Sequence, residues 1–328
     1  MAYAPLRPPS LPASNQSTAP MRVCVFAHFD SRCRIDPHVF YTLRALAKVT
    51  DRLIFVSACA LPRSERQRAG RIADRVVIRR NRGLDFGSWK AGLTAVDLRS
   101  ADELVLCNDS CFGPLGSFEQ FFGAMEKEHC DFWGITASRE IRFHVQSYFL
   151  VFRKSVLRDP AFADFWDRLV PQSLKSAVIL INEVGLTRLL VERGHVPGTY
   201  FRLTLGSSLA AVRLRAGAFW TDFMGVHPAS LRFRLVGLLR MARCLSERLW
   251  PVNPSHVYWP LLMKCKVPLI KVELLRDNPL DVDLKGLNHA LKDQVPRLWP
   301  MIQRYLARNA KRETRILSTM TKRMESNH

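Results

Sequence analysis

The chain alternates short apolar runs with amphipathic stretches from Met21 onward. Four of the apolar runs are rich in Val, Leu and Ile, are five to seven residues long, and predict β-strands at 22–28, 52–57, 75–79 and 103–107. The stretches between these runs have the spacing of amphipathic helices, so strand–helix units repeat along the chain. Such repeats predict an α/β fold with a mainly parallel central sheet and helices on both faces.

Helical spacing is clearest where Phe40, Leu43, Leu46 and Ala47 fall on one face. Near residue 194, a glycine after a run of Leu and Val predicts the end of a helix. The same criteria predict further helices at 62–73, 87–97, 119–128, 161–169 and 181–193, and further strands at 131–136 and 145–152.

Three regions follow from this pattern. Residues 1–20 are rich in Pro and Ser and have no apolar face to bury, so we expect a disordered, dispensable leader without a secretory signal. Residues 21–200 form the predicted α/β domain. In residues 201–328 the pattern of apolar positions is less regular, and we expect a helical C-terminal extension there. The run Leu249–Met263 is uncharged for 15 residues but contains three prolines. It is shorter than the roughly 18 residues of a spanning helix, so we expect no membrane span.

Composition is that of a globular protein, with 48% hydrophobic and 24% charged residues, but the formal net charge is +20. This charge suits nucleic acid, an anionic membrane surface, or acidic small substrates such as nucleotide sugars. Arginines interleaved with apolar residues predict membrane-facing surfaces at 230–250 and 302–316, with a solvated basic face as the alternative. Eight cysteines without C-x-x-C spacing predict reduced, mostly buried thiols.

Polar residues collect where the predicted strands end. In an open α/β sheet, ligands bind beyond the carboxyl ends of the strands, so these residues are candidates for a ligand site. A turn or helix cap is the alternative for each of them. The candidates are His28 and Asp30 after the first strand, Asn81, Gly83 and Asp85 after the third, and Asn108, Asp109 and Ser110 after the fourth.

The segment after the third strand carries two glycines, Gly83 and Gly87, that let the backbone approach a ligand closely. Between them, Asp85 has a carboxylate that accepts hydrogen bonds from a ribose or a base. The glycine spacing matches neither a Walker loop nor G-x-G-x-x-G, so kinase, ATPase and Rossmann oxidoreductase functions lose their main support.

Three further side chains suggest chemistry. A rigid turn holds Asp109 at the sheet edge, a position that suits a divalent cation shared with a diphosphate; a local turn cap is the alternative. Glu183 is predicted at a helix start, where a carboxylate also complements the helix dipole. His144 precedes an apolar strand, and hydrogen-bonded structure is the alternative to catalysis. No Ser–His–Asp order or H-E-x-x-H motif favours a hydrolase.

Together these motifs resemble the rhamnan synthesis F family of glycosyltransferases. The resemblance spans most of residues 22–280 and implies a GT-A-like nucleotide-sugar transferase of bacterial surface polysaccharide or lipopolysaccharide assembly, with dTDP-rhamnose as donor. The segments that carry it are His28–Asp30, Asn81–Trp89, Asn108–Ser110 with Gly113–Leu115, Asp131–Gly134, His144–Phe149, Asn182–Glu183, Asn253–His256 and Pro268–Pro279.

The resemblance also implies roles. Asp30 and Asp85 would bind the nucleoside, and Asp109 would bind the diphosphate through Mg²⁺ or Mn²⁺. Glu183, with His144 as a second catalytic candidate, would deprotonate an acceptor hydroxyl in a direct, inverting displacement. Asn108-Asp109-Ser110 stands where many such enzymes have D-x-D, so one carboxylate replaces two.

The implied setting is the inner face of the cytoplasmic membrane, where the enzyme would be peripheral to an anionic surface and residues 201–328 would contact a lipid-linked or saccharide acceptor. No nucleic-acid partner is expected. The rival hypothesis is a non-catalytic basic scaffold that binds nucleic acid or an anionic membrane, supported by the +20 charge.

Overall fold

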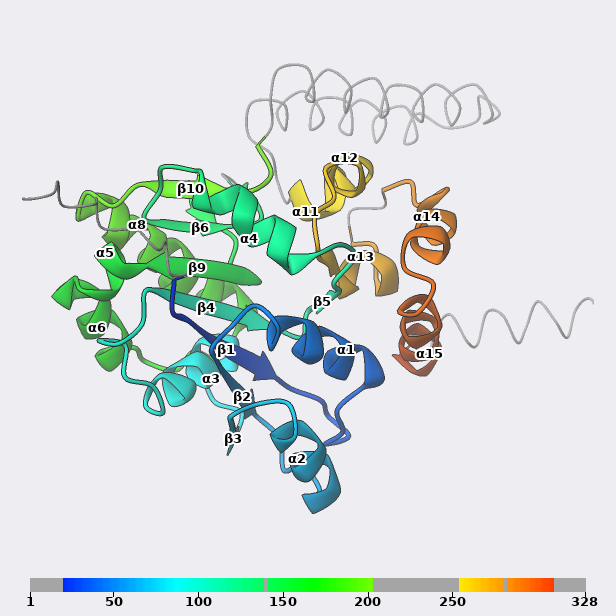
Figure 1. Ribbon diagram of the computed structural model, residues 1–328, viewed down its shortest axis with the longest axis horizontal. Coiled ribbons are helices and arrows are strands. Elements are labelled where there is room, and N and C mark those ends of the chain that lie inside the picture. The colour runs from blue at the N-terminus through cyan, green and yellow to red at the C-terminus, as the bar shows by residue number, and fades with distance from the viewer. Residues whose placement is uncertain (1–19, 139–140, 203–253, 280–281, 310–328) are drawn as a thin grey trace, which may run out of the picture.

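Seven strands form the central sheet of the computed structural model, which describes residues 20–138, 141–202, 254–279 and 282–309 (Figure 1). Only β9 runs antiparallel to its neighbours within this sheet, so the predicted mainly parallel α/β fold is confirmed. In sheet order the strands are β10 (Pro197–Thr199), β6 (Phe132–Gly134), β9 (Phe149–Arg153), β4 (Glu103–Asn108), β1 (Arg22–His28), β2 (Arg52–Ser57) and β3 (Arg75–Ile78).

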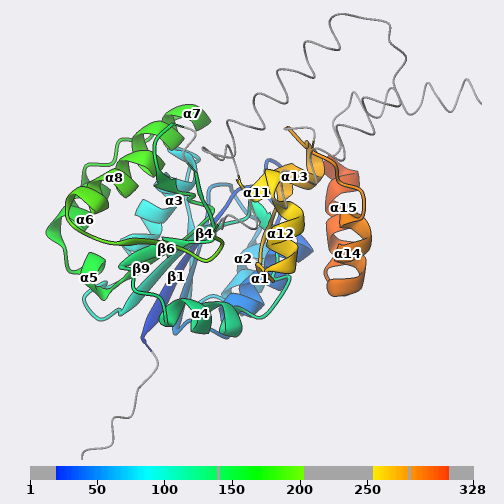
Figure 2. The same cartoon turned by 90° about the horizontal axis from the view of Figure 1, so that it is seen from above.

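Helices cover both faces of the sheet because the central strands are apolar on both sides. All seven residues of β1 are buried: Cys24 and Phe26 belong to one apolar cluster, Val23 and Val25 to the other. The views in Figures 1 and 2 show the two helical layers. The first cluster includes side chains of α1 (Pro37–Leu46), α2 (Arg63–Gly70) and α4 (Phe118–Glu126); the second includes side chains of α3 (Leu84–Leu93), α5 (Lys154–Leu157), α6 (Pro160–Asp167) and α8 (Val184–Glu192).

The C-terminal region returns to the sheet and has an apolar cluster of its own around Phe112. Phe112 lies on β5 (Cys111–Phe112), which pairs antiparallel with β11 (Ile270–Lys271). The helical C-terminal extension is therefore confirmed for the part of the chain that the structure describes. Its helices are α11 (Pro254–Val257), α12 (Trp259–Lys264), α13 (Val272–Arg276), α14 (Leu287–Gln294) and α15 (Trp299–Asn309).

Two strand predictions were wrong in extent. The run 145–152 is divided between β8 (His144–Val145) and β9, and β8 pairs with β7 (Ala137–Ser138) in a small separate sheet. The run 131–136 is a strand only over β6. The reason is a local hydrogen bond from the Gln146 amide to the Thr136 carbonyl, which joins the part of one run after β6 to the part of the other before β9, outside the central sheet. His144 is thereby placed on a short hairpin beside the sheet.

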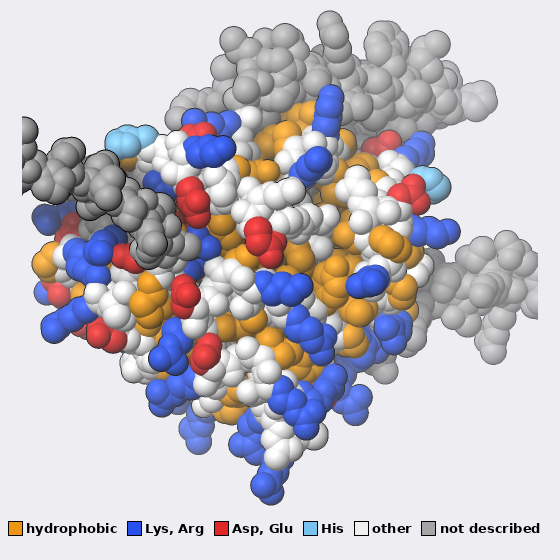
Figure 3. All heavy atoms as spheres, viewed as in Figure 1, with side chains coloured by type: hydrophobic (Ala, Val, Ile, Leu, Met, Phe, Trp, Pro, Cys, Tyr) orange, Lys and Arg blue, Asp and Glu red, His pale blue; other side chains and the backbone are white. Residues whose placement is uncertain are grey.

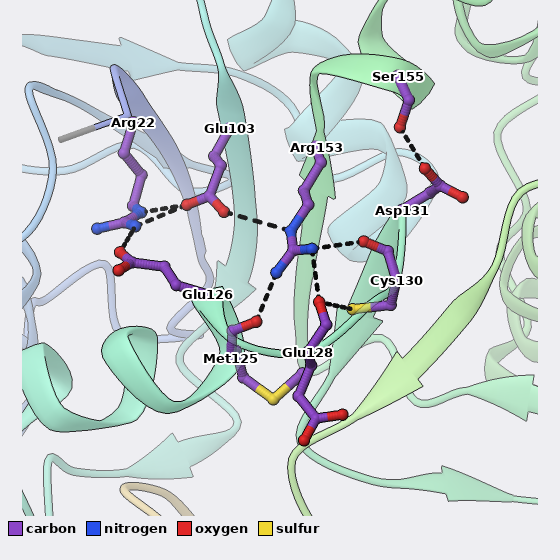
Figure 4. A network of polar contacts seen from close by, with 9 residues as sticks. All are labelled: Arg22, Glu103, Met125, Glu126, Glu128, Cys130, Asp131, Arg153 and Ser155. Carbon is purple, nitrogen blue, oxygen red and sulfur yellow. Dashed lines mark hydrogen bonds and ion pairs between the residues drawn. The ribbon is translucent and has the colours of Figure 1, made fainter. Parts of the chain in front are cut away.

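Buried ion pairs join three strands at the end of the sheet opposite the strand ends discussed above (Figure 4). Arg22 of β1 donates to the Glu103 carboxylate of β4 at 2.7 Å, and both side chains are nearly fully buried. The Nε of Arg153, on β9, lies 3.8 Å from the same carboxylate. Because a buried charge is costly unless paired, this network fixes the register of β1, β4 and β9.

No helix within the described ranges is long and apolar enough to cross a membrane. The seven cysteines in those ranges are all free, and five of them are buried, as the sequence predicted. The stretch 230–250, predicted to face a membrane, lies outside the described residues.

Candidate active site

A cavity of about 480 Å³ opens beyond the carboxyl ends of β1 and β4. It is walled by the strand ends on one side, by the hairpin of β8 and the helix that carries Glu183 on another, and by the returning C-terminal region on the third. Eight of the ten site residues predicted from the sequence line it: His28, Asp30, Asp85, Asn108, Asp109, Ser110, His144 and Glu183.

The other two predicted residues, Asn81 and Gly83, do not line this cavity. Asn81 is exposed. Gly83 has φ of +78°, and a Cβ there would lie 3.0 Å from Cβ of Pro171. Gly83 therefore serves the backbone turn into α3, which begins three residues earlier than predicted and places Asp85 in its first turn.

Asn108 holds the strand ends together. Its Nδ2 donates to Asp85 at 2.8 Å, while its Oδ1 accepts from the Ser110 hydroxyl at 2.5 Å and from the Ser110 amide at 3.2 Å. Burial raises the pKa of Asp85, against the lowering effect of the Asn108 hydrogen bond and of the Lys271 charge. Asn108 thus positions the Asp85 carboxylate at the cavity wall.

Asp109 is not the local turn cap that was the alternative for it. Its Oδ2 accepts from the Phe29 amide at 2.8 Å and so ties the end of β4 to the loop after β1. Burial, together with the nearby Asp85 carboxylate, raises the pKa of Asp109 to about 8. His28 supplies no compensating charge: burial lowers its pKa to about 4, and its Nε2 is 3.9 Å from Asp109.

Asp109 is the residue that could hold a divalent cation here, with substrate phosphates completing the shell. Across the described residues, no group of three or more His, Cys, Asp or Glu gathers to hold a metal alone. Mg²⁺ in particular is commonly held by one or two carboxylates together with substrate phosphates. Burial, and after it the Asp85 carboxylate, raises the pKa of Asp109, and a cation bound there would favour the ionised form of this carboxyl.

Glu183 is not at a helix start, contrary to the prediction. It is the last residue of a π-helical turn, η1 (Val178–Glu183), which lies between α7 (Lys175–Ala177) and α8 in one continuous helical stretch. With no free amide end there, the helix-dipole explanation for Glu183 is removed. π-Turns within helices occur often at functional sites because they redirect a side chain.

His144 and Ser147 hold the Glu183 carboxylate from two sides. His144 Nε2 lies 3.1 Å from Oε1, and the Ser147 hydroxyl donates to Oε2. Burial by itself raises the pKa of Glu183, but the His144 hydrogen bond and charge and the Ser147 hydrogen bond outweigh it and lower the pKa below its ordinary value. Glu183 is therefore ionised at neutral pH.

The protonation of His144 follows from its two partners. Its Nδ1 lies 2.8 Å from the Arg142 carbonyl, which only accepts, so Nδ1 carries a proton. Donation from Nε2 to the ionised Glu183 then requires a second proton, which makes His144 an imidazolium. Because the carboxylate stands between Ser147 and His144, the imidazole does not activate the serine, and the arrangement is not a hydrolase triad.

Three cations that the sequence analysis did not select also line the cavity: Lys175, Lys271 and Arg276. Two of them come from residues 271–276, in the region predicted to contact the acceptor, yet they line the same cavity as Asp85 and Asp109. The available signal was the motif Pro268–Pro279, which is part of the family resemblance and carries Lys271 and Arg276.

The helix α15 closes the cavity on the C-terminal side. Tyr305 lines the cavity, Arg308 pairs with Asp36, and Ile302 is fully buried in the C-terminal cluster. The apolar face of the described part of 302–316 is therefore internal. This corrects the expectation that its apolar residues face a membrane, and residues 310–316 lie outside the described ranges.

Comparison with known proteins agrees with the resemblance read from the motifs. Residues 53–208 match the model of the rhamnan synthesis protein F family. A virulence protein, VirA, of Vibrio anguillarum is 29% identical over 214 residues, which cover 63% of this chain and 64% of that protein. The chain thus spans less than two thirds of the length of this relative.

Among solved structures, a mannosyltransferase from Pyrobaculum calidifontis, in complex with GDP-Man and Mn²⁺, is similar at a TM-score of 0.37 and 13% identity, covering 89% of this chain and 88% of that one. TarS of S. aureus is similar at a TM-score of 0.35 and 13% identity, covering 85% and 81%. With scores below 0.5, these two likenesses carry no further argument.

Proposed function

We propose that the chain, whose residues 53–208 match the rhamnan synthesis protein F family, is a glycosyltransferase that uses a nucleoside-diphosphate sugar. The observation that carries the proposal is the shared cavity, which is lined by Asp85 and Asp109 at the strand ends and by Glu183 from the helical stretch. Sugar transfer needs both features: a place for the leaving diphosphate and a base for the acceptor hydroxyl.

In this mechanism Asp30 and Asp85 would bind the nucleoside, and Asp109 would hold the diphosphate end of the donor. A Mg²⁺ or Mn²⁺ ion bound there would supply positive charge to the departing diphosphate. Glu183 would take the proton of the acceptor hydroxyl, with the imidazolium of His144 and the Ser147 hydroxyl fixing its orientation. A single base with direct attack corresponds to inversion at the anomeric carbon.

The donor in this proposal is dTDP-rhamnose, and the acceptor is a lipid-linked or saccharide chain of bacterial surface polysaccharide or lipopolysaccharide. Both specifics come from the family resemblance. The setting that goes with a lipid-linked acceptor is the inner face of the cytoplasmic membrane.

A basic surface supports membrane association in this proposal. The segment 63–82 carries eight arginines against Glu65 and Asp74, and all but Arg79 of these arginines are exposed. Figure 3 shows Lys and Arg side chains gathered at the lower end of the molecule, around α2. Each basic residue near an anionic leaflet contributes about 1 kcal/mol.

The rival function, a non-catalytic basic scaffold that binds nucleic acid or a membrane, is favoured by the same surface. It leaves unexplained why the half-buried carboxylates of Asp85, Asp109 and Glu183 share one cavity. A titration with fluorescent RNA at several salt concentrations distinguishes the two, since a scaffold would bind RNA with a steep salt dependence and ignore nucleotide sugars.

A thermal-shift screen of nucleotide sugars, with and without Mn²⁺, tests the proposed function. A ligand at 100 times its Kd adds about 2.7 kcal/mol to the stability of the folded state, so the true donor should raise the Tm clearly. Free rhamnose and thymidine serve as controls, because each lacks the diphosphate. If no nucleoside-diphosphate sugar raises the Tm while RNA does, the glycosyltransferase proposal fails.

A further inference from the structure

We infer that Lys271 binds the diphosphate of the donor. Its positive charge comes from the C-terminal region to a site where the Asn108-Asp109-Ser110 motif has one carboxylate in place of two. The inference rests on the function proposed above, because it takes the cavity to be a nucleotide-sugar site. It assigns a phosphate-binding role to the short returning segment, residues 268–272.

The backbone of the returning segment is fixed directly beside the strand-end motif. Lys271 pairs with Cys111 in the antiparallel ladder of β5 and β11. The Val272 amide donates to the Ser110 carbonyl at 2.8 Å. Beyond the other end of the ladder, the Leu115 amide donates to the Pro268 carbonyl at 2.7 Å. The ladder therefore holds Lys271 opposite Cys111, which is two residues after Asp109 in the chain, and Lys271 lines the same cavity as Asp109.

The ammonium of Lys271 is free for a ligand, whereas the other two cations of the cavity are in ion pairs with carboxylates. Lys175 pairs with Glu273 at 3.2 Å, and Arg276 pairs with Asp277 at 2.7 Å. No carboxylate oxygen of any residue in the described ranges lies within 4.0 Å of Lys271 Nζ. An ammonium has three donors and is a common ligand of phosphate oxygens, so this one is suited to an anion in the cavity.

Tyr148 gives the ammonium a firm position. The Nζ atom of Lys271 lies 4.3 Å from the centroid of the Tyr148 ring, which is almost fully buried. The Tyr148 hydroxyl is 2.8 Å from the Thr136 hydroxyl, so the ring is fixed at both ends. A ring face attracts a cation without occupying its donors, so the platform orients Lys271 and leaves its protons for phosphate.

The alternative role is a counter-ion for the cavity carboxylates. Lys271 acts electrostatically on both Asp85 and Glu183, yet it forms an ion pair with neither. A counter-ion alone would stabilise the fold and would not discriminate between ligands with and without a diphosphate. The two roles therefore differ in a measurable way.

Calorimetric titration of the full chain with dTDP, UDP, GDP, inorganic pyrophosphate and thymidine, each with Mn²⁺, tests the inference. Lys271→Met and Lys271→Gln should weaken the preferred nucleoside diphosphate and pyrophosphate by about 10- to 100-fold, the scale of one charge-assisted hydrogen bond, and leave thymidine unchanged. Lys271→Arg should retain most of the affinity. Lys264→Met, at an exposed lysine of α12, is the matched control and should bind like the parent.

The outcomes distinguish a failure of the proposed function from a failure of the diphosphate role of Lys271. If the parent protein binds no nucleoside diphosphate, the proposed function fails. If the parent binds one and Lys271→Met and Lys271→Gln bind it within about twofold, or lose thymidine equally, the diphosphate role of Lys271 is overturned while the proposed function stands. The Tm of each variant, measured without ligand, identifies a variant that is unfolded, and the comparison then rests on the other substitutions.

Discussion

The Nε2 atom of His144 lies 3.1 Å from Oε1 of Glu183, although the two residues belong to a hairpin and a helix that are 39 positions apart in the chain. The Arg142 carbonyl fixes the opposite ring nitrogen of His144 as a donor. The pair is therefore an imidazolium and a carboxylate, and it faces the cavity. The expected effects of replacing Glu183 and of replacing His144 both depend on this contact.

Glu183→Gln should lower turnover by about 10²- to 10⁴-fold, the usual scale for losing a general base, while donor affinity stays near that of the parent. Turnover on a lipid-linked acceptor and donor affinity by calorimetry provide the two measurements. Glu192→Gln, an exposed position on the same helical stretch, is the control and should leave both unchanged. A Glu183→Gln enzyme within about threefold of the parent would exclude the base assignment.

His144→Gln should move the acidic limb of the pH profile of kcat/KM to higher pH. In the parent, burial raises the pKa of Glu183 but His144 and Ser147 hold it below its ordinary value. Without the imidazolium, burial is opposed less and the pKa rises, so more alkaline pH is needed to ionise the base. An acidic limb at the same pH in both enzymes would show that His144 does not act through Glu183.

Asp109→Asn should make the protein more stable and weaken donor binding. The pKa of Asp109 is about 8 in the folded protein against an ordinary value of 3.8. Between those values the folded state retains a proton that the unfolded chain loses, so this group lowers stability as pH rises. In EDTA, the Tm of the variant should exceed that of the parent by at least about 2 °C at pH 8.

The same comparison at pH 3 controls for effects unrelated to charge, because Asp109 is largely protonated there in both states. A Tm difference that is equal at pH 3 and pH 8 would contradict the raised pKa. Calorimetry with dTDP and Mn²⁺ gives the second readout, which should show weaker binding by Asp109→Asn.

Gly113→Ala should destabilise the fold by about 1–3 kcal/mol and weaken diphosphate binding. A Cβ at Gly113 would lie 2.4 Å from Leu269 Cδ2 and 2.6 Å from the Pro268 carbonyl oxygen, so the returning segment would have to move. Gly123→Ala in α4 is the control, because nothing lies within 4 Å of its added methyl group. Urea unfolding of both variants measures the difference. Equal midpoints would show that residues 268–272 move aside at no measurable cost in stability.

Flotation with liposomes should recover the protein on anionic vesicles and not on neutral ones. Replacing Arg63, Arg66 and Arg71 by Glu should reduce the recovery sharply, because all three are exposed and each changes the charge by two. Arg188 in α8 and Arg193, the residue that follows this helix, replaced by Glu, give a control away from α2. Equal recovery of the parent on neutral and anionic vesicles would remove the electrostatic argument.

The sequence by itself determined the fold class and most of the strand-end residues. Apolar runs such as 22–28 are buried on both faces, and their periodicity is a local property that the chain displays directly. The polar residues that follow them, among them Asp30, Asp85 and Asp109, meet at one edge because parallel strands end on the same side. The eight arginines of the segment 63–82 are likewise a feature of the sequence alone.

Only the tertiary structure decided which distant groups complete the site. Glu183 sits within a helix because a π-turn continues it, and a π-turn depends on packing that periodicity does not reveal. His144 reaches Glu183 because a hydrogen bond from Gln146 to Thr136 divides a run that has the composition of one strand. Lys271 reaches the cavity through pairing with Cys111 across 160 positions of chain, a contact between two-residue strands too short to leave a pattern.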